Sequence, residues 1–285
     1  MLQKQINSGF FIIFESMQSV KPESQNRKSV LIHSGALDRS VLVDLYLPPL
    51  VRVDALRVLL INDGQDLDRM RFESILSQLY QNNSIRPLLC VGIHAGPQRK
   101  LEYGTAHAPD YRGRGSLAPR YTHFVIRELT PFIKNLFPGL ILADWAFAGF
   151  SLGGLSALDI TWAHPQLFRT TGVFSGSLWW RSLDKTDLRY RDESHRLMHG
   201  LIRAGHYEPG LKFFFECGTE DETEDRNNNG VIDSIDDTKD LMRELMLKGY
   251  TPGEDICYLE MPGGSHDPAT WGLAMPHFLK WGWPA

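Results

Sequence analysis

Residues 145–163 read WAFAGFSLGGLSALDITWA, and this stretch decides the fold. Its first part, Trp145–Phe150, is a short apolar run typical of a buried strand, and Leu152–Ala163 has the length and composition of a helix. Between them, a Gly-x-Ser-x-Gly pattern places Ser151 on the sharp turn from strand to helix, where the glycines let neighbouring backbone approach closely. This context predicts an exposed nucleophilic serine, with an ordinary Gly-Ser turn as the alternative.

The segments on either side alternate between short apolar runs and helical patterns. The runs typical of strands are Ser29–His33, Val41–Leu47, Val58–Ile61, Leu88–Ile93, Thr170–Phe174, Lys212–Cys217 and Ile256–Glu260. Helical spacing covers Met70–Tyr80, Tyr121–Phe137, Ser194–Ala204, Asp237–Lys248 and Pro268–Trp281. Strands that alternate with helices predict an α/β protein with three α/β/α layers and a mostly parallel central sheet. Because two strands open the chain in succession, the N-terminal edge of this sheet is expected to be antiparallel.

The chain has the size and composition of one folded unit. It has 285 residues, of which 42% are hydrophobic and 22% are charged. No internal repeat and no linker rich in Pro, Gly or Ser divides it. We therefore expect a single domain over residues 1–285, with a polar stretch at about residues 16–28.

The charge balance and the cysteines limit the partners and the compartment. With 30 Lys and Arg against 34 Asp and Glu, the net charge of −4 provides no basic field for nucleic acid. The apolar run Phe10–Phe14 is too short to span a membrane or to form a signal peptide. Cys90, Cys217 and Cys257 are widely spaced in apolar runs, which predicts buried thiols in a reducing, cytoplasmic environment. The expected partner is a small-molecule substrate, and homo-oligomer formation stays open.

A serine hydroxyl needs a base and an orienting carboxylate before it can attack a substrate. In this architecture the chain order is serine, acid, histidine, and these groups follow the carboxyl ends of strands. His266 lies in the Gly-rich loop directly after the last strand, and Asp221 follows the strand before it. We therefore predict Ser151, Asp221 and His266 as the catalytic residues. The same acidic loop leaves Glu220, Glu222 and Glu224 open as alternatives to Asp221.

Two backbone N–H groups are expected to stabilise a developing oxyanion. One is the amide of Leu152, directly after the nucleophile. The other is the amide of Gln65, in the loop that follows Val58–Ile61. A plain Asp-Gly turn at Asp63 and Gly64 is the alternative for the second loop.

These motifs resemble those of the esterase D and enterochelin esterase-like family of the α/β-hydrolases, a branch that also includes feruloyl esterases, S-formylglutathione hydrolases and mycolyltransferases. The resemblance runs from about Leu42 to Trp281. Its most specific pieces are Asp63-Gly64-Gln65, the elbow at residues 149–154, Ser175-Gly176-Ser177-Leu178-Trp179-Trp180, and Gly264-Ser265-His266-Asp267 with Trp271. It implies the α/β-hydrolase fold, a Ser-Asp-His ester hydrolase with an acyl-enzyme intermediate, and the Gln65 amide in the oxyanion hole. It does not carry the substrate. The N-terminal substrate-binding module of enterochelin esterases is not expected here, since only about forty residues precede the second predicted strand.

The cover of the site is expected in the irregular segment after Leu88–Ile93 and at the end of Thr170–Phe174. A loop rich in Gly, Pro and aromatic residues above the carboxyl edge of a sheet suits an aromatic or extended acyl group. The side chains predicted to contact substrate are Arg99, Tyr103, Tyr111, Arg120, Trp179 and Trp180. For the two tryptophans the alternative is that they cap the core.

Residues 225–236, DRNNNGVIDSID, match the pattern of a calcium-binding loop. The expected ligands are Asp225, Asn227, Asn229, Val231 through its carbonyl, Asp233 and Asp236. Gly230 stands where such loops turn sharply, and Asp236 stands where a bidentate Glu is usual, which resembles the loops of dockerins. The pattern predicts a structural Ca²⁺ with no role in catalysis, and a metal-free Asn-rich surface loop is the alternative.

Three functions stay open at this point. The leading one is a serine esterase that hydrolyses carboxylic esters. The same triad also suits an acyltransferase that passes the acyl group to a sugar or thiol, and the fold suits a non-catalytic binding protein. An intact serine, acid and histidine argues against the third.

Overall fold

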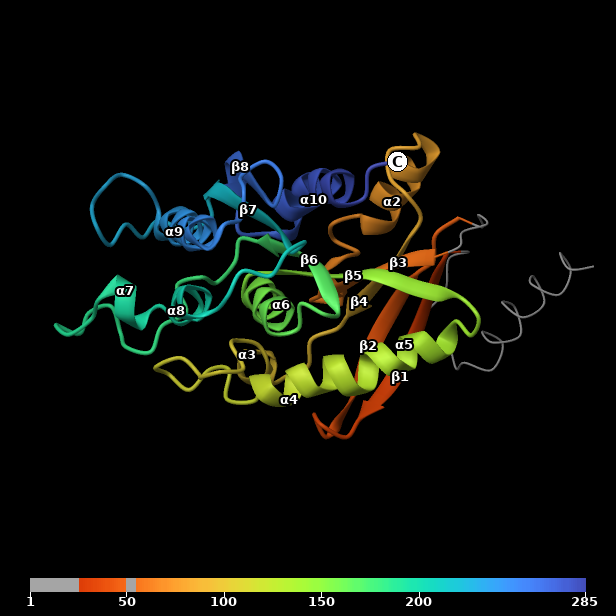
Figure 1. Cartoon of the computed structure of the whole chain (residues 1–285), viewed down its shortest axis with the longest axis horizontal. Helices are drawn as coiled ribbons and strands as arrows, with labels where there is room; N and C mark the ends of the chain where they lie inside the picture. Colours follow the sequence, from red (N-terminus) through yellow and green to blue (C-terminus); the bar gives the residue numbers. More distant parts are fainter. Residues whose placement is uncertain (1–25, 50–54) are drawn as a thin grey trace, which may run out of the picture.

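The computed structural model describes residues 26–49 and 55–285, and its centre is one mixed sheet. Eight strands lie in the order β1-β2-β4-β3-β5-β6-β7-β8 (Figure 1). Their bounds are β1 Arg27–Ser34, β2 Arg39–Tyr46, β3 Ala55–Asn62, β4 Leu88–Ile93, β5 Ile141–Phe150, β6 Phe168–Phe174, β7 Lys212–Glu220 and β8 Ile256–Ser265. The β1–β2 and β2–β4 pairs are antiparallel, and the other neighbouring pairs are parallel. The predicted α/β class and the antiparallel N-terminal edge are confirmed.

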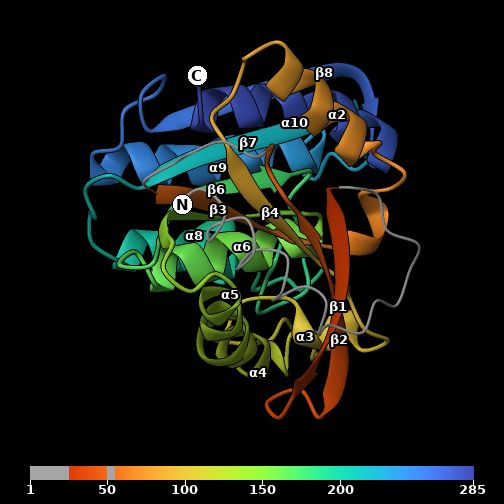
Figure 2. The same cartoon turned by 90° about the vertical axis from the view of Figure 1, so that its right-hand side faces the viewer.

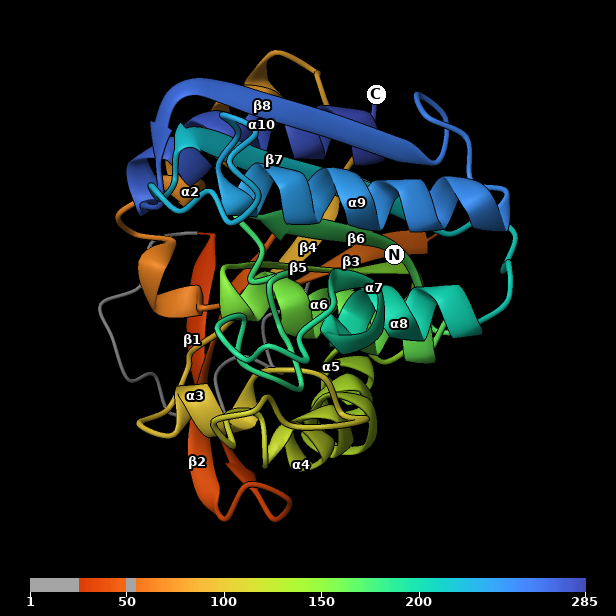
Figure 3. The same ribbon diagram turned by 90° about the vertical axis from the view of Figure 1, so that its left-hand side faces the viewer.

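Helices cover both faces of the sheet, which gives the three predicted layers (Figure 2). Their bounds are η1 Gly64–Asp66, α2 Phe72–Gln81, α3 Arg99–Glu102, α4 Ala118–His123, η2 Phe124–Leu129, α5 Thr130–Leu136, α6 Leu152–Ala163, α7 Asp192–His195, α8 Leu197–Ala204, α9 Asp233–Lys248 and α10 Pro268–Gly282. Residues of α2 and α10 form one apolar cluster, and residues of α6, α8 and α9 form part of another. Figure 3 accordingly shows α9 in front of β7 and β8, with α10 behind them. Within the described ranges, no helix has the length and apolar character that crossing a bilayer requires.

The helix after Ser151 is enclosed by the rest of the protein. Every residue from Leu152 to Thr161 is buried, which explains why apolar residues occur on all sides of this helix. β4 is likewise buried along its whole length, as expected of a parallel strand covered on both faces. The last six residues of β5, Trp145–Phe150, are buried as well, so the turn between β5 and α6 lies between two enclosed elements.

Several elements differ from the predicted bounds for local reasons. The helix over 118–136 is continuous but contains a π-helical turn, Phe124–Leu129, directly before Pro131, whose nitrogen carries no hydrogen to donate. The predicted Ser194–Ala204 helix is divided into α7 and α8 at Arg196, whose side chain is held by Asp237 and Asp240 at 2.8 Å each. The predicted polar stretch at 16–28 lies largely outside the described residues.

The three cysteines are free thiols. Cys90 and Cys217 are buried as predicted, whereas Cys257 is only half-buried. Burial raises the pKa of the Cys90 thiol, so this group stays protonated and unreactive.

Candidate active site

Ser151 occupies a strained backbone conformation between β5 and α6. Its φ of 56° and ψ of −123° lie in a region that side-chain-bearing residues rarely adopt. The elbow is also tight, because a Cβ atom at Gly149 would lie 2.4 Å from the Gly153 backbone. The Ser151 N–H donates to the carbonyl of Phe174 on the neighbouring strand at 2.9 Å. These constraints hold the Ser151 side chain at the carboxyl edge of the sheet.

The predicted base and acid lie together at the ends of β7 and β8. Nδ1 of His266 is 4.0 Å from Oδ1 of Asp221. The Asp221 side chain is 1% exposed and that of His266 is 39% exposed, so the imidazole is open to a substrate and the carboxylate is not. Of the alternative acids, Glu220 is exposed and Glu224 pairs with Lys185.

Burial shifts the titration of both groups. It raises the pKa of Asp221, which the hydrogen bond from Ser175 and the charge of His266 counteract. It lowers the pKa of His266 below the ordinary histidine value, and the positive charge of Arg99 adds to this lowering while Asp221 opposes it. A neutral imidazole near neutral pH suits a general base.

Ser175 and Trp271 support the acid in a way that the sequence did not reveal. The Ser175 hydroxyl donates to Oδ1 of Asp221 at 3.0 Å and accepts a hydrogen bond from Nε1 of Trp271 at 2.9 Å. The Trp271 ring stacks on Phe150 and meets the His266 ring edge-on at 5.4 Å between centroids. One tryptophan thus contacts the strand before the nucleophile, the base and the group that holds the acid.

The two amides predicted for the oxyanion hole are the backbone N–H groups of Leu152 and Gln65. Among the described residues, neither the Leu152 nor the Gln65 backbone N–H has a hydrogen-bond acceptor. The Gln65 side chain fixes its own loop, because its Oε1 accepts from the Ala95 N–H at 3.0 Å and its Nε2 donates to Asp63 at 3.2 Å. This loop is more than a plain Asp-Gly turn, since its side chains join the ends of β3 and β4.

Arg99 lies beside the nucleophile strand and forms a bidentate ion pair. Its Nε and Nη2 donate to the two carboxylate oxygens of Asp63 at 2.6 and 2.7 Å, and Nη2 also donates to the Phe150 carbonyl at 3.3 Å. Asp63 is buried and Arg99 is partly exposed. This pair holds the Arg99 guanidinium beside the end of β5, with its charge balanced by Asp63.

The other residues predicted to contact substrate differ in how far their side chains are exposed. Tyr103 and Trp180 are both 0% exposed, and Trp180 fills the space beside Gly104 and Gly115, so these two side chains belong to the core and do not agree with a substrate-contacting role. Arg120 is exposed on α4, and Tyr111 and Trp179 are half-buried. Trp179 and Tyr111 therefore keep surface that a ligand can contact.

The predicted calcium loop, residues 225–236, forms a compact turn that leads into α9, and Asp233 and Asp236 already lie in the first turn of that helix. The Asp225 carboxylate accepts from the backbone N–H groups of Asn229 and Gly230, and Oδ2 of Asp236 accepts from the side-chain amides of Asn227 and Asn229. Asp233 instead pairs with Arg226 at 3.1 Å, and the Val231 N–H donates to Asn229. Within residues 26–49 and 55–285, no group of three or more His, Cys, Asp or Glu side chains is placed to hold a metal ion.

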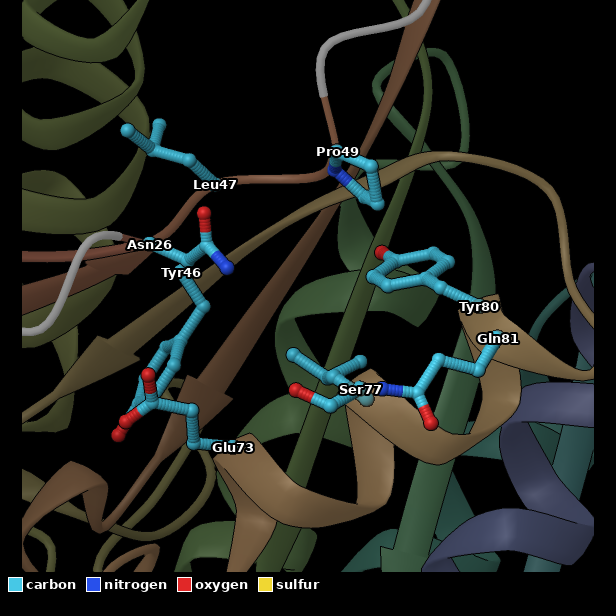
Figure 4. A pocket seen from close by; sticks show the side chains of 9 residues that line it. Asn26, Tyr46, Leu47, Pro49, Glu73, Ser77, Tyr80 and Gln81 are labelled. Carbon is cyan, nitrogen blue, oxygen red and sulfur yellow. The ribbon is translucent and has the colours of Figure 1, made fainter.

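A pocket of about 280 Å³ lies between β2 and α2 (Figure 4). Its lining includes Tyr46, Glu73 and Tyr80. The Tyr80 hydroxyl hydrogen-bonds the backbone of Leu88 at the start of β4, so this pocket lies toward the amino end of that strand, away from the edge that carries Ser151. Its lining contains none of the predicted site residues, and we assign it no role in the reaction.

A parallel sheet with helices on both faces and a serine elbow at its carboxyl edge defines an α/β-hydrolase. The family model described as "Putative esterase" matches residues 34–281, and the chain belongs to this esterase family. A siderophore triacetylfusarinine C esterase from Aspergillus fumigatus is 36% identical over 63 residues, which are 22% of this chain and 22% of that protein.

Solved structures of esterases share the fold. The enterobactin esterase from Shigella flexneri superposes with a TM-score of 0.69 at 21% identity and covers 94% of this chain and 60% of that one. The BES protein from Bacillus cereus has a TM-score of 0.69 at 17% identity, with 95% and 99% of the two chains covered. A siderophore hydrolase from Aspergillus nidulans has a TM-score of 0.65 at 17% identity, with 92% and 97% covered. The chain thus spans less than two thirds of the Shigella flexneri enzyme.

Proposed function

We propose that this chain is a serine carboxylic-ester hydrolase that works through an acyl-enzyme. Ser151 is the nucleophile, His266 the general base and Asp221 the acid that orients the histidine. The observation that carries the proposal is that a serine on a strained elbow shares one sheet edge with a buried aspartate and an accessible imidazole. Membership of the esterase family supports this reaction class.

In the acylation step, Nε2 of His266 takes the proton of the Ser151 hydroxyl while Oγ attacks the ester carbonyl. The carbonyl oxygen becomes an oxyanion, which the N–H groups of Leu152 and Gln65 stabilise. The ester C–O bond then breaks, and the alcohol leaves with the proton from His266. As positive charge develops on the imidazole, the separation between Nδ1 and Asp221 is expected to shorten to a hydrogen bond.

In the deacylation step, water replaces the alcohol. His266 takes a proton from water, the resulting hydroxide equivalent attacks the acyl carbonyl, and the acid is released as Ser151 regains its proton. An acyltransferase would use an acceptor alcohol or thiol in place of this water.

The decisive test compares two serines whose hydroxyls lie 3.3 Å apart, Ser151 and Ser177. Ser151→Ala is expected to lose several orders of magnitude in hydrolysis and all labelling by a fluorophosphonate. Ser177→Ala serves as the matched control and is expected to keep the label. Labelling that persists in Ser151→Ala would show that the nucleophile is another residue.

The substrate class requires a separate screen. Aryl, feruloyl, short-acyl and catecholate esters should be compared by kcat/KM, with siderophore esters included because of the siderophore esterases among the similar proteins. Adding an acceptor alcohol to the same reactions separates hydrolysis from acyl transfer. Transfer product that forms in preference to free acid would identify an acyltransferase.

A further inference from the structure

Glu216 is a buried acid that the mechanism above does not use. It lies in β7 and is 0% exposed. In the sheet register it stands between Phe174 of β6 and Leu259 of β8, and it follows Phe214, which packs on α10, by two residues. Among the described residues, neither oxygen of its carboxyl group has a hydrogen-bond partner. An ionised carboxylate without donors in such apolar surroundings is strongly disfavoured.

The carboxylate of Asp221 lacks a hydrogen-bond donor at one of its two oxygens. Its Oδ1 accepts from Ser175 and faces His266, whereas its Oδ2 is buried and, in the part of the chain that the structure describes, has no donor. Ser175 connects the two acids, because its N–H donates to the backbone carbonyl of Glu216 at 2.8 Å and its hydroxyl donates to Asp221 at 3.0 Å. The Glu216 carboxyl group, which has no hydrogen-bond partner, and Oδ2 of Asp221, which has no donor, thus both belong to residues that Ser175 contacts.

The charges around Glu216 favour its neutral form. Burial raises its pKa to about 8 and the charge of Asp221 raises it as well, while the N–H and hydroxyl of Ser175, which lie near its carboxyl group outside the geometry of a full hydrogen bond, oppose this rise. The nearby Cys217 and Tyr258 are neutral because burial raises the pKa of each. On the side of Glu216, β6, β8 and α10 contribute Phe174, Leu259 and Trp271 to the surrounding cluster, and none of these carries a charge. Burial raises the pKa of both Glu216 and Asp221, and the charge of one disfavours ionisation of the other.

We propose that Glu216 is a positioning residue for the catalytic acid: its carboxyl group keeps its proton and donates a hydrogen bond to Oδ2 of Asp221. This bond would leave Oδ1 directed at Ser175 and His266. It would also keep a single negative charge in the acid pair, so that the imidazolium formed during catalysis faces one oriented carboxylate. The inference rests on the proposed function only in that Asp221 orients His266.

The kinetic test uses one variant that keeps a donor and one that removes it. Glu216→Gln is neutral and retains N–H donors, so we expect kcat within about threefold of the wild type and an unchanged acid limb of kcat/KM against pH. Glu216→Leu leaves Oδ2 of Asp221 without a partner, and kcat should fall by about tenfold to a hundredfold at constant KM, the value of one hydrogen bond to a charged group. Glu220→Gln, on an exposed residue of the same strand, is the control and should change neither quantity.

Two kinetic outcomes would overturn the proposal. If Glu216 were ionised, Glu216→Gln would remove a negative charge and shift the acid limb to lower pH. If Glu216→Leu kept the wild-type kcat, the acid would not need this donor. Because Glu216→Gln is isosteric, the comparison holds even where the Leu variant fails to fold.

Infrared spectroscopy reads the proton without any ester substrate. In heavy water at neutral pH, the difference spectrum between the wild type and Glu216→Gln should contain the carbonyl band of a protonated carboxylic acid. The difference between the wild type and Glu220→Gln should lack this band. Its absence from the Glu216→Gln spectrum would refute the proposal, whereas hydrolysis that survives in Ser151→Ala would refute the proposed function alone.

Discussion

Replacing Ser151 by glycine should stabilise the protein relative to replacing it by alanine, although both variants lose the nucleophile. Alanine keeps the Cβ atom and therefore keeps the strain of φ 56° and ψ −123°. Strain of this kind costs about 1–3 kcal/mol at a residue with a side chain. Glycine adopts the conformation freely but gains about 0.4–1 kcal/mol of conformational freedom in the unfolded chain. The strain is the larger quantity, so the glycine variant should be more stable than the alanine variant by about 0.5–2 kcal/mol.

The assay is thermal and denaturant unfolding of both variants side by side. For a chain of 285 residues, each kcal/mol moves Tm by about 2 °C, so the glycine variant should melt about 1–4 °C higher. Ser74 is the matched control, because it lies exposed within α2, where the backbone is unstrained. There the order should reverse, with glycine less stable than alanine by about 1 kcal/mol. If the Ser151 pair showed the same order as the Ser74 pair, the elbow would store no strain.

Three further predictions concern the acid, the base and the loop before α9. In a pH series of kcat/KM, activity should fall as pH drops through the pKa of His266. Because burial lowers that pKa, the enzyme should stay active below the pH at which an ordinary histidine becomes protonated. An acid limb above the ordinary histidine pKa would contradict this prediction. Asp221→Asn should reduce kcat by about 10³–10⁴-fold, whereas Gln at Glu220 should not, and the reverse order would reassign the acid. Calcium at a hundred times its Kd should stabilise the fold by about 2.7 kcal/mol, and EGTA or a double Asp225→Ala, Asp236→Ala variant should abolish this effect. Melting curves that do not change with calcium would show that residues 225–236 bind no metal.

The sequence predicts the fold well because the length and burial of its apolar segments distinguish strands from helices along the chain. Continuous apolar runs such as Leu88–Ile93 become strands buried on both faces, and the apolar segment Leu152–Ala163 becomes a helix enclosed on all sides. The differences arise where long-range contacts decide the local structure. Arg196 divides one predicted helix because Asp237 and Asp240 hold its side chain, and those partners lie about forty residues further along the chain.

The site divides in the same way. Ser151, Asp221 and His266 could be predicted because chain order and strand ends place them, and the structure does bring Asp221 to His266. Tyr103 and Trp180 lie in the core, although the sequence predicts substrate contact for both and leaves core packing open for Trp180. Aromatic residues in a loop have no periodicity that distinguishes core from cover. The sequence also gives no sign that Ser175 binds the acid, since a serine acquires this role only from the side chains that surround it in the fold.

The positions of Trp179, Trp180 and Trp271 indicate a different role for each of these residues. Trp180 is buried in the core and Trp271 holds Ser175, so these two residues serve the framework and the acid. Trp179 keeps exposed surface, and the guanidinium of Arg114 lies 4.6 Å from its ring centroid. Trp179 is therefore placed to contact substrate and not to support the acid. It follows that Trp271→Phe, which removes the N–H donor and keeps the ring, should act on kcat for every ester, whereas Trp179→Ala should change the ranking of esters by KM. The opposite pattern would show that Trp271 contacts the ester and that Trp179 does not.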